Sequence, residues 1–167
     1  IGEAFAMKRR HLLQSTVAAA VAASLPTGKA LAAALAALAE VSGDVNAVTG
    51  GGAQITLEQA AVKELSEALR GRLLLPGFEG YDSARRVLNA SIDKHPALIV
   101  QPTGAADVSL AVSFARERDL LLAVKCGGHS YGGTSTCDGG MQIDLSRLRS
   151  ARVDPSSKTA WLAAGSL

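Results

Sequence analysis

Residues 120–133 read LLLAVKCGGHSYGG, a continuous apolar run that passes directly into a glycine-rich segment. The run over 120–125 is typical of a strand that is covered on both faces, as in a parallel sheet. Glycines allow positive φ angles and a close approach of the backbone to a ligand, and successive amides in such a turn suit phosphate oxygens. The order of strand and glycine loop therefore predicts an α/β-type sheet with an anion-binding turn at the end of this strand.

The spacing of the glycines excludes two familiar phosphate-binding motifs. Position 129 is a histidine, so residues 127–132 do not form the G-x-G-x-x-G of a dinucleotide fold. Gly132 is followed by Gly133 and Thr134 rather than by the Lys and Ser or Thr of a nucleoside-triphosphatase loop. The loop therefore predicts a phosphate-bearing cofactor that is held in another way.

Cys126 and Cys137 lie on either side of His129, so a metal site and a disulfide are alternatives to consider. A C-x-x-H with one distant cysteine lacks the paired spacing and the fourth ligand of a structural zinc site, and we predict no metal. An oxidising compartment would allow a disulfide, but nothing in the sequence sets the separation of the two thiols. We predict that both cysteines are small core residues.

The segments on either side of the loop have the pattern of alternating strands and helices. The stretch PALIVQP at 96–102 predicts a strand over 97–101, followed by a helix that Thr103 caps. This strand, the helix and the strand 120–125 form the pattern of a right-handed parallel crossover. Two later strands are expected over 141–145 and 159–164, with a turn between them at 154–156. Asp144, which lies among apolar neighbours, is expected to accept structural hydrogen bonds rather than to act as a base.

Upstream of this unit, Thr56 and Gln59 have the spacing of a capping box. They predict a helix that ends at Gly71. A short strand is expected next, over 72–75. A second helix is expected to begin at Asp82 or Ser83, to continue through Leu88 and to end near 89–91.

The N-terminal quarter has a different composition from the rest of the chain. Hydrophobic residues make up 48% of the 167 residues but aromatic residues only 4%, because alanine dominates residues 17–39. That stretch follows Met7 and a basic cluster that contains Arg9 and Arg10, which is the order of an export signal of the twin-arginine class. An alanine-rich amphipathic helix with a basic end is the alternative.

We therefore divide the chain into four parts: a signal segment (7–36), a glycine-containing linker (37–55), a lead-in of helices and strands (56–94) and a main domain (95–167). The net charge is only +2 and no basic stripe with interleaved aromatics occurs, which argues against nucleic acid as a partner. No strongly hydrophobic run reaches the length of about 18 residues that a stable membrane span needs. The chain stops after an apolar run with no closing element, so we expect an N-terminal fragment of a longer protein.

Three ordered motifs carry a family resemblance: PALIVQPTGAADV at 96–108, KCGGHSYGG at 125–133 and CDGGMQIDLSRL at 137–148. Together they resemble the FAD-binding, PCMH-type domain of the vanillyl-alcohol oxidase superfamily, in particular bacterial berberine-bridge-like and 6-hydroxynicotine-oxidase-like flavoproteins. The resemblance covers the chain from about Leu73 onward. It implies an α+β fold, the first part of an FAD-binding domain of two subdomains.

The resemblance also implies a cofactor site. The backbone of 127–132 is expected to hold the pyrophosphate of FAD, and His129 matches the family's histidine that bonds covalently to the 8α-methyl carbon of the isoalloxazine ring. A neutral imidazole nitrogen is a competent nucleophile near neutral pH. Many relatives make a second flavin bond through a downstream cysteine, which neither cysteine here can match. The residues expected to bind the cofactor are Lys125, Cys126, Gly127, Gly128, His129, Ser130, Tyr131 and Gly132.

The function that this resemblance implies is that of an exported FAD-dependent oxidoreductase, periplasmic or secreted. It would oxidise an alcohol- or amine-type carbon of a small molecule by hydride transfer to covalently held FAD, which oxygen reoxidises. The twin-arginine export machinery is the expected partner. Family members place the substrate pocket and base in a downstream domain, so no catalytic residue is assigned and the fragment alone is expected to be inactive. The alternative is a truncated, non-catalytic remnant or a folding module.

Overall fold

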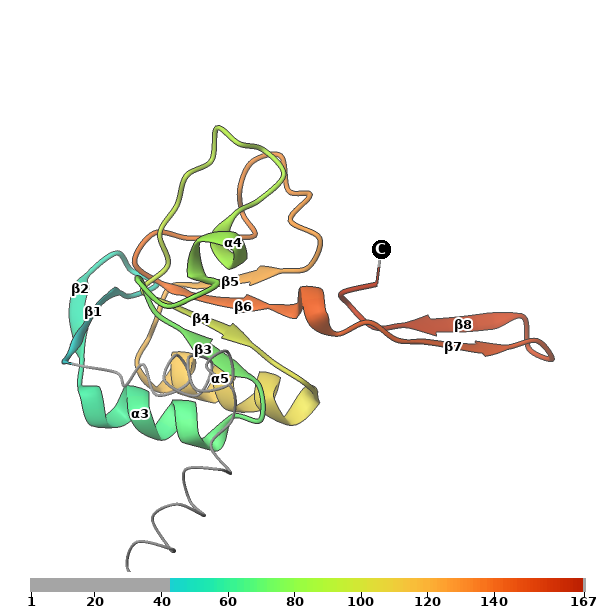
Figure 1. Cartoon of the computed structure of the whole chain (residues 1–167), viewed down its shortest axis with the longest axis horizontal. Helices are drawn as coiled ribbons and strands as arrows, with labels where there is room; N and C mark the ends of the chain where they lie inside the picture. The colour runs from blue at the N-terminus through green and yellow to red at the C-terminus, as the bar shows by residue number, and fades with distance from the viewer. Residues whose placement is uncertain (1–42, 167) are drawn as a thin grey trace, which may run out of the picture. The chain divides into compact units, whose positions relative to one another are not determined.

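The structure is a computed structural model, and it describes residues 43–166. Strands and helices are mixed along the chain, as the sequence predicts (Figure 1). In chain order they are β1 (Val45–Val48), β2 (Gln54–Leu57), α3 (Gln59–Ala68), β3 (Arg72–Leu74), α4 (Tyr81–Arg85), β4 (Leu98–Gln101), α5 (Ala105–Glu117), β5 (Leu122–Lys125), β6 (Met141–Asp144), a 3-10 turn (Leu145–Arg147), β7 (Ala151–Asp154) and β8 (Thr159–Leu162).

The central sheet has four strands in the order β3-β4-β6-β5. Strands β4, β6 and β5 are parallel, and β3 is antiparallel to β4. The expected parallel strands on either side of α5 are present, but β6, which comes later in the chain, lies between them. Strand β5 is therefore an edge strand. Its residues Leu122 and Val124 are 38% and 49% exposed, which corrects the prediction of a strand covered on both faces.

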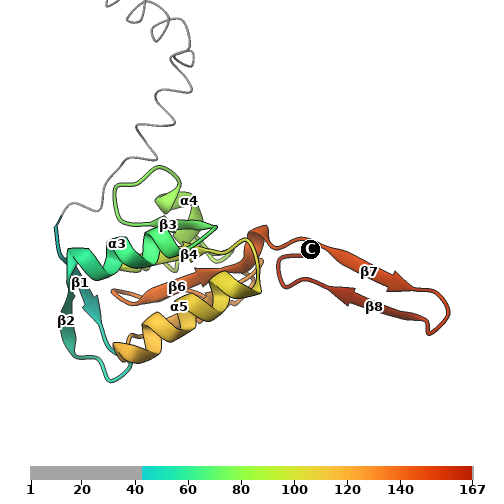
Figure 2. The ribbon, with the colours of Figure 1, turned by 90° about the horizontal axis from the view of Figure 1, so that it is seen from below.

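The two faces of this sheet are covered by different helices. Figure 2 shows α3 and α5 side by side on one face, where their apolar residues pack on alternate residues of β4 and β6. The short helix α4 lies on the opposite face and contributes Tyr81 and Ala84 to a smaller cluster with Leu74 and Ile99. Since side chains alternate along a strand, each parallel strand presents one set of residues to α3 and α5 and the other set to α4.

The segment expected to be a linker contains a packed β-hairpin. Strands β1 and β2 pair in antiparallel fashion, and Ala47 and Leu57 are 1% and 3% exposed within the main core. The glycines at 50–52 serve the turn between these strands, where Gly52 has φ +86. The prediction of a linker is thus corrected for residues 45–55. The signal segment predicted over 7–36 and the start of the linker, up to 42, lie outside the described residues.

Helix α3 begins differently from the predicted capping box. Thr56 lies in β2 rather than at a cap, and the helix starts at Gln59. The Gln59 amide donates to the side chain of Asp44 at 2.9 Å. A carboxylate supplied from 15 residues upstream therefore takes the place of a local cap, and it suits the positive end of the helix dipole.

Helix α5 also lacks the cap that the sequence predicts. Gly104 is its first flanking residue, and no side chain caps it there. The Thr103 amide and hydroxyl instead donate to the Asp107 carboxylate at 2.8 and 2.9 Å, and the Arg70 amide donates to it at 3.0 Å. Burial by itself raises the pKa of Asp107, but these hydrogen bonds hold that pKa below its ordinary value.

Two further predictions need correction in length or connection. Helix α4 covers only Tyr81–Arg85, so it ends before Leu88. The turn that follows Asp154 joins β8 to β7, a strand that the sequence did not predict. This hairpin extends away from the sheet (Figures 1 and 2), and its Val153, Trp161 and Leu162 are at least 61% exposed. Within residues 43–166, no helix is both long and apolar enough to cross a membrane.

Candidate cofactor site

All the residues predicted to bind a cofactor lie on one segment, which begins at the last residue of β5 and runs toward β6. The histidine in its middle, His129, is exposed, and the Tyr131 side chain is 87% exposed. An added Cβ at Gly132 would meet nothing within 4 Å. The loop therefore has an open side at the carboxyl ends of the parallel strands, where α/β sheets bind ligands.

The turn of this loop depends on two glycines and on Ser130. Gly128 and Gly133 have φ +71 and +69, and an added Cβ at Gly133 would lie 2.7 Å from the Ile92 side chain. The Ser130 hydroxyl accepts from the Thr134 amide at 3.1 Å, and the Ser130 carbonyl accepts from the Gly133 amide at 3.1 Å. Ser130 thus closes the turn. Its side chain is engaged within the loop itself.

A second segment, residues 86–95, braces the loop from behind. The Leu88 amide donates to the Gly128 carbonyl at 2.9 Å, and the Asn89 amide side chain donates to the Tyr131 carbonyl at 2.9 Å. The Lys94 ammonium donates to the Gly133 carbonyl at 3.3 Å. The carbonyls of Gly128, Tyr131 and Gly133 thus accept hydrogen bonds from the bracing segment. The amides of residues 128–132, in contrast, donate to no other residue that the structure describes. Such free amides fit an anionic group such as a pyrophosphate.

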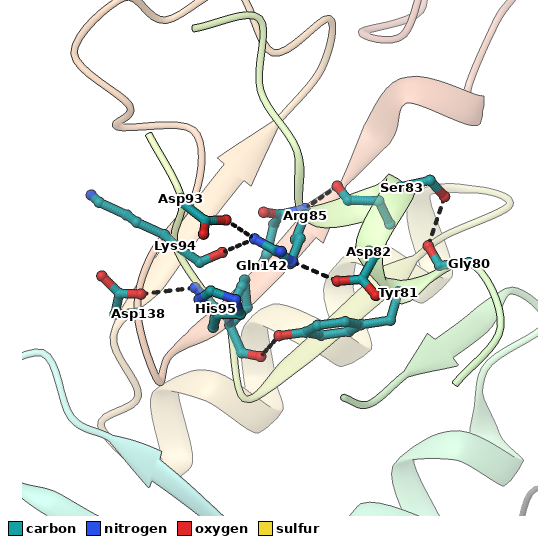
Figure 3. A network of polar contacts seen from close by, with 12 residues as sticks. Gly80, Tyr81, Asp82, Ser83, Arg85, Asp93, Lys94, His95, Asp138 and Gln142 are labelled. Atoms are coloured by element: carbon teal, nitrogen blue, oxygen red, sulfur yellow. Dashed lines mark hydrogen bonds and ion pairs between the residues drawn. The ribbon is translucent and has the colours of Figure 1, made fainter. Parts of the chain in front are cut away.

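The bracing segment is itself held by Arg85, at the end of α4. Figure 3 shows the Arg85 guanidinium between Asp82 and Asp93. It donates to Asp82 at 2.8 Å, to the Asp93 carboxylate and to the Lys94 carbonyl at 3.2 Å. The hydrogen bond from Arg85 lowers the pKa of Asp93. The start of α4 and the end of the bracing segment are therefore joined through one cation.

Further contacts join the bracing segment to the stretch that leads into β6. The His95 amide donates to the Asp138 carboxylate at 2.8 Å (Figure 3). The His95 carbonyl accepts from the Gly139 amide at 2.9 Å. The Tyr81 hydroxyl of α4 donates to the Pro96 carbonyl at 2.6 Å, and burial raises the pKa of Tyr81. Both long loops beside the candidate site are thus fixed to α4 and to one another.

Lys125 is turned inward, away from the open side of the loop. It is 7% exposed, and its ammonium donates to the Ala84 carbonyl of α4 at 2.5 Å. It also lies 3.7 Å from the carboxylate of Asp144. Asp144 further accepts from the Gln101 side chain at 3.0 Å and from the Ser146 amide at 3.1 Å. The prediction that Asp144 is a structural acceptor is confirmed.

The two cysteines are free thiols in the structure. Cys137 is 5% exposed, and burial raises the pKa of its thiol to about 11. Cys126 is half-buried, so only Cys137 matches the expectation of a core residue. No group of three or more His, Cys, Asp or Glu side chains that could hold a metal ion occurs in residues 43–166.

Comparison with known proteins identifies the class of domain that the C-terminal part of the chain resembles. Residues 96–167 match the family model described as "FAD binding domain". An FAD-linked oxidoreductase of Dictyostelium discoideum is 35% identical over 105 residues, which cover 62% of this chain and 23% of that protein. Berberine bridge enzyme-like 21 of Arabidopsis thaliana is 37% identical over 79 residues, which cover 46% of this chain and 15% of that protein.

A solved structure supports the same assignment. The 6-hydroxy-D-nicotine oxidase of Arthrobacter nicotinovorans superposes with a TM-score of 0.56 at 28% identity, over 59% of this chain and 22% of that one. The chain therefore spans less than a quarter of the length of these relatives. The matches confirm the resemblance that the three sequence motifs carry, and with it the expected α+β fold as part of an FAD-binding domain.

Proposed function

We propose that this chain, which matches an FAD-binding domain over residues 96–167 and is similar to berberine bridge enzyme-like proteins, is the FAD-binding portion of an exported flavin enzyme. The family supports FAD as the cofactor and flavin-dependent oxidation as the class of reaction. Export rests on the twin-arginine pattern around Arg9 and Arg10. The twin-arginine machinery would then be a partner of the folded protein.

The observation that carries the proposal is the loop that holds His129. Its side chain is exposed, the amides of 128–132 are available to an anion, and residues 86–95 brace the loop's carbonyls from behind. These residues fit a pyrophosphate along the backbone, with His129 beside the ring system of the flavin. When bound, FAD would accept a hydride from an alcohol- or amine-type carbon and pass two electrons to oxygen.

His129 is the residue we propose for the covalent link. The bond would join one imidazole nitrogen of His129 to the 8α-methyl carbon; each partner would give up one proton, and oxygen would take up the two electrons that the new bond leaves over. The glycines of the loop have no side chains, and a Cβ added at Gly132 would meet nothing within 4 Å, so there is room for a ring on the open side of the loop. No residue of the described chain is proposed as the catalytic base, which we place with the substrate pocket in a downstream domain.

The proposal is tested by adding FAD to the full-length protein, precipitating it in acid and measuring flavin fluorescence in the washed protein. We expect the wild-type protein and a His95→Ala variant to retain flavin, because the exposed His95 makes its hydrogen bonds to the described residues through its backbone. We expect His129→Ala to release it completely. Retention by His129→Ala would refute the covalent role of His129. Absence of binding to the wild-type chain before acid treatment would refute the proposal that this chain binds FAD.

A further inference from the structure

Lys125 joins the cofactor loop to α4, and it does so from the buried side of the sheet. The two acceptors within reach of its ammonium are the Ala84 carbonyl at 2.5 Å and the Asp144 carboxylate at 3.7 Å. The same Ala84 carbonyl accepts from the Gln142 side chain at 2.9 Å. One carbonyl of α4 is therefore linked to both β5 and β6.

We infer that Lys125 is a positioning residue for His129 rather than a ligand of the cofactor, an inference that rests on the proposed function. A buried ammonium is stable only where acceptors replace its water, and here those acceptors lie on the α4 face of the sheet. Lys125 is only 7% exposed and its ammonium is directed to the Ala84 carbonyl, so it is not placed to meet a phosphate on the open side of the loop. The sequence places Lys125 next to the loop but does not show this direction.

Gly128 transmits the position of Lys125 to the histidine. A Cβ built on Gly128 would lie 3.5 Å from Cε of Lys125 and 3.4 Å from Cα of Val87, so the lysine stem and the bracing segment both lie next to this glycine and leave little space beside it. The Gly128 carbonyl is tied to the Leu88 amide at 2.9 Å. His129 is the next residue. Loss of the lysine would remove the stem beside Gly128 and the link to α4 together.

The consequence is specific to the loop. Without its anchor, the segment after β5 would sample more conformations, and the imidazole of His129 would spend less time in the position that reaches a bound ring. Flavin attachment would slow even if the rest of the domain stayed folded. A merely structural role would instead lower the stability of the whole domain and leave attachment to the folded chain unchanged.

The experiment compares the wild-type full-length protein with its variants Lys125→Met and Lys125→Met/Asp144→Asn and with a matched surface control, Lys63→Met. Amide hydrogen exchange without flavin is measured at Leu88, Gly133 and Thr134, whose amides donate to the Gly128 carbonyl, the Ser130 carbonyl and the Ser130 hydroxyl of the loop. Covalent attachment to His129 is followed over time after FAD is added. We expect exchange of these amides to be at least tenfold faster and attachment at least tenfold slower in Lys125→Met. The control is expected to stay within twofold of wild type for both measurements.

The double variant separates positioning from folding, because it removes the unpaired buried carboxylate that the single variant leaves behind. We expect it to regain global stability in urea but not the attachment rate. Recovery of both, or faster exchange spread evenly over the domain, would overturn the inference.

Lys125→Arg keeps the cation and its donors, so it remains informative if the methionine variant does not fold. We expect it to attach flavin within threefold of the wild-type rate, and a tenfold loss would contradict an anchoring role of the charge. If the wild-type chain takes up no flavin, the proposed function fails, while hydrogen exchange still decides whether Lys125 holds the loop.

Discussion

The face of the central sheet toward α3 and α5 is lined by aliphatic side chains, whereas the face toward α4 carries a row of polar ones. Strands β4 and β6 present Leu98, Val100, Met141 and Ile143 to the first face. At the carboxyl ends of the strands, the second face carries Gln101, Asp144 and Lys125, which the strand register aligns. The same three parallel strands therefore build a hydrophobic core on one side and a polar network on the other.

The two faces therefore have different roles: the apolar face stabilises the fold, and the polar face orients the cofactor loop. Burial of apolar surface is non-directional and contributes about 1.5–3 kcal/mol for each fully buried large side chain. It stabilises the sheet but sets no orientation at the loop. Hydrogen bonds and ion pairs require defined distances and angles, so the polar face can fix where the segment after β5 begins.

Leu98→Ala tests the apolar face and should have the largest effect on stability. Leu98 is fully buried, and a cavity at such a position costs about 2–5 kcal/mol of the free energy of unfolding. Leu88→Ala is the matched control, because Leu88 is 73% exposed and should change that free energy by less than about 0.5 kcal/mol. Urea denaturation of both variants gives the comparison. Equal costs would show that the apolar face does not carry the fold.

Asp107→Asn tests a buried carboxylate on the α5 side of the sheet, which is stabilised by uncharged hydrogen-bond donors. On the α4 side, the buried carboxylate of Asp144 instead lies beside the cation Lys125. We expect a loss of about 1–3 kcal/mol near neutral pH, because three donors lose their charged acceptor. The pKa of Asp107 is lower in the folded state, so its contribution is fully present above the unfolded value of about 3.9 and disappears as pH falls through the folded value.

The stability gap between wild type and Asp107→Asn should accordingly shrink as the solution is made acidic. Urea denaturation over a series of pH values, from neutral down to about 2, measures this gap. A gap that stays constant over the whole series would show that the carboxylate is not stabilised in its charged form.

Gly128→Ala tests whether the cofactor loop, which follows the polar face of the sheet, needs a glycine at this position. It is expected to have the smallest effect on the free energy of unfolding. The left-handed backbone at Gly128, with φ +71, costs an alanine about 1–2 kcal/mol. Gly51→Ala, at a glycine without a positive φ and with no atom closer than 3.8 Å to an added Cβ, should be nearly neutral. Urea denaturation measures both costs. If the two alanines cost the same, the conformation of the loop is not a constraint.

Sequence reasoning was most successful where a feature depends on adjacent residues. The apolar runs that become β4, β5 and β6 and the glycine loop between the last two can be located from their composition alone. It failed where partners are far apart. The link from Lys94 to Gly133 spans 39 residues, and that from Asn89 to Tyr131 spans 42, so no local pattern predicts the brace.

The errors at helix starts and in the linker have the same origin. Thr56 and Gln59 match a capping box, but pairing of β2 with β1 places Thr56 in a strand, and Asp44 reaches the helix from that hairpin. The glycines at 50–52 are as typical of a flexible linker as of a tight turn. The burial of Ala47 in the core shows that they form a tight turn.

The sequence by itself determined the unit of strand, glycine loop and strand and the place of His129 within it, because short-range patterns of apolar residues and glycines encode them, and its ordered motifs carry the resemblance to FAD-binding domains. The tertiary structure alone decided that β6 lies between β4 and β5, that the bracing segment lies behind the loop, and that Lys125 is directed into the sheet toward α4. These features depend on pairings between distant segments, whose free energy is gained only when the chain closes the loops between them.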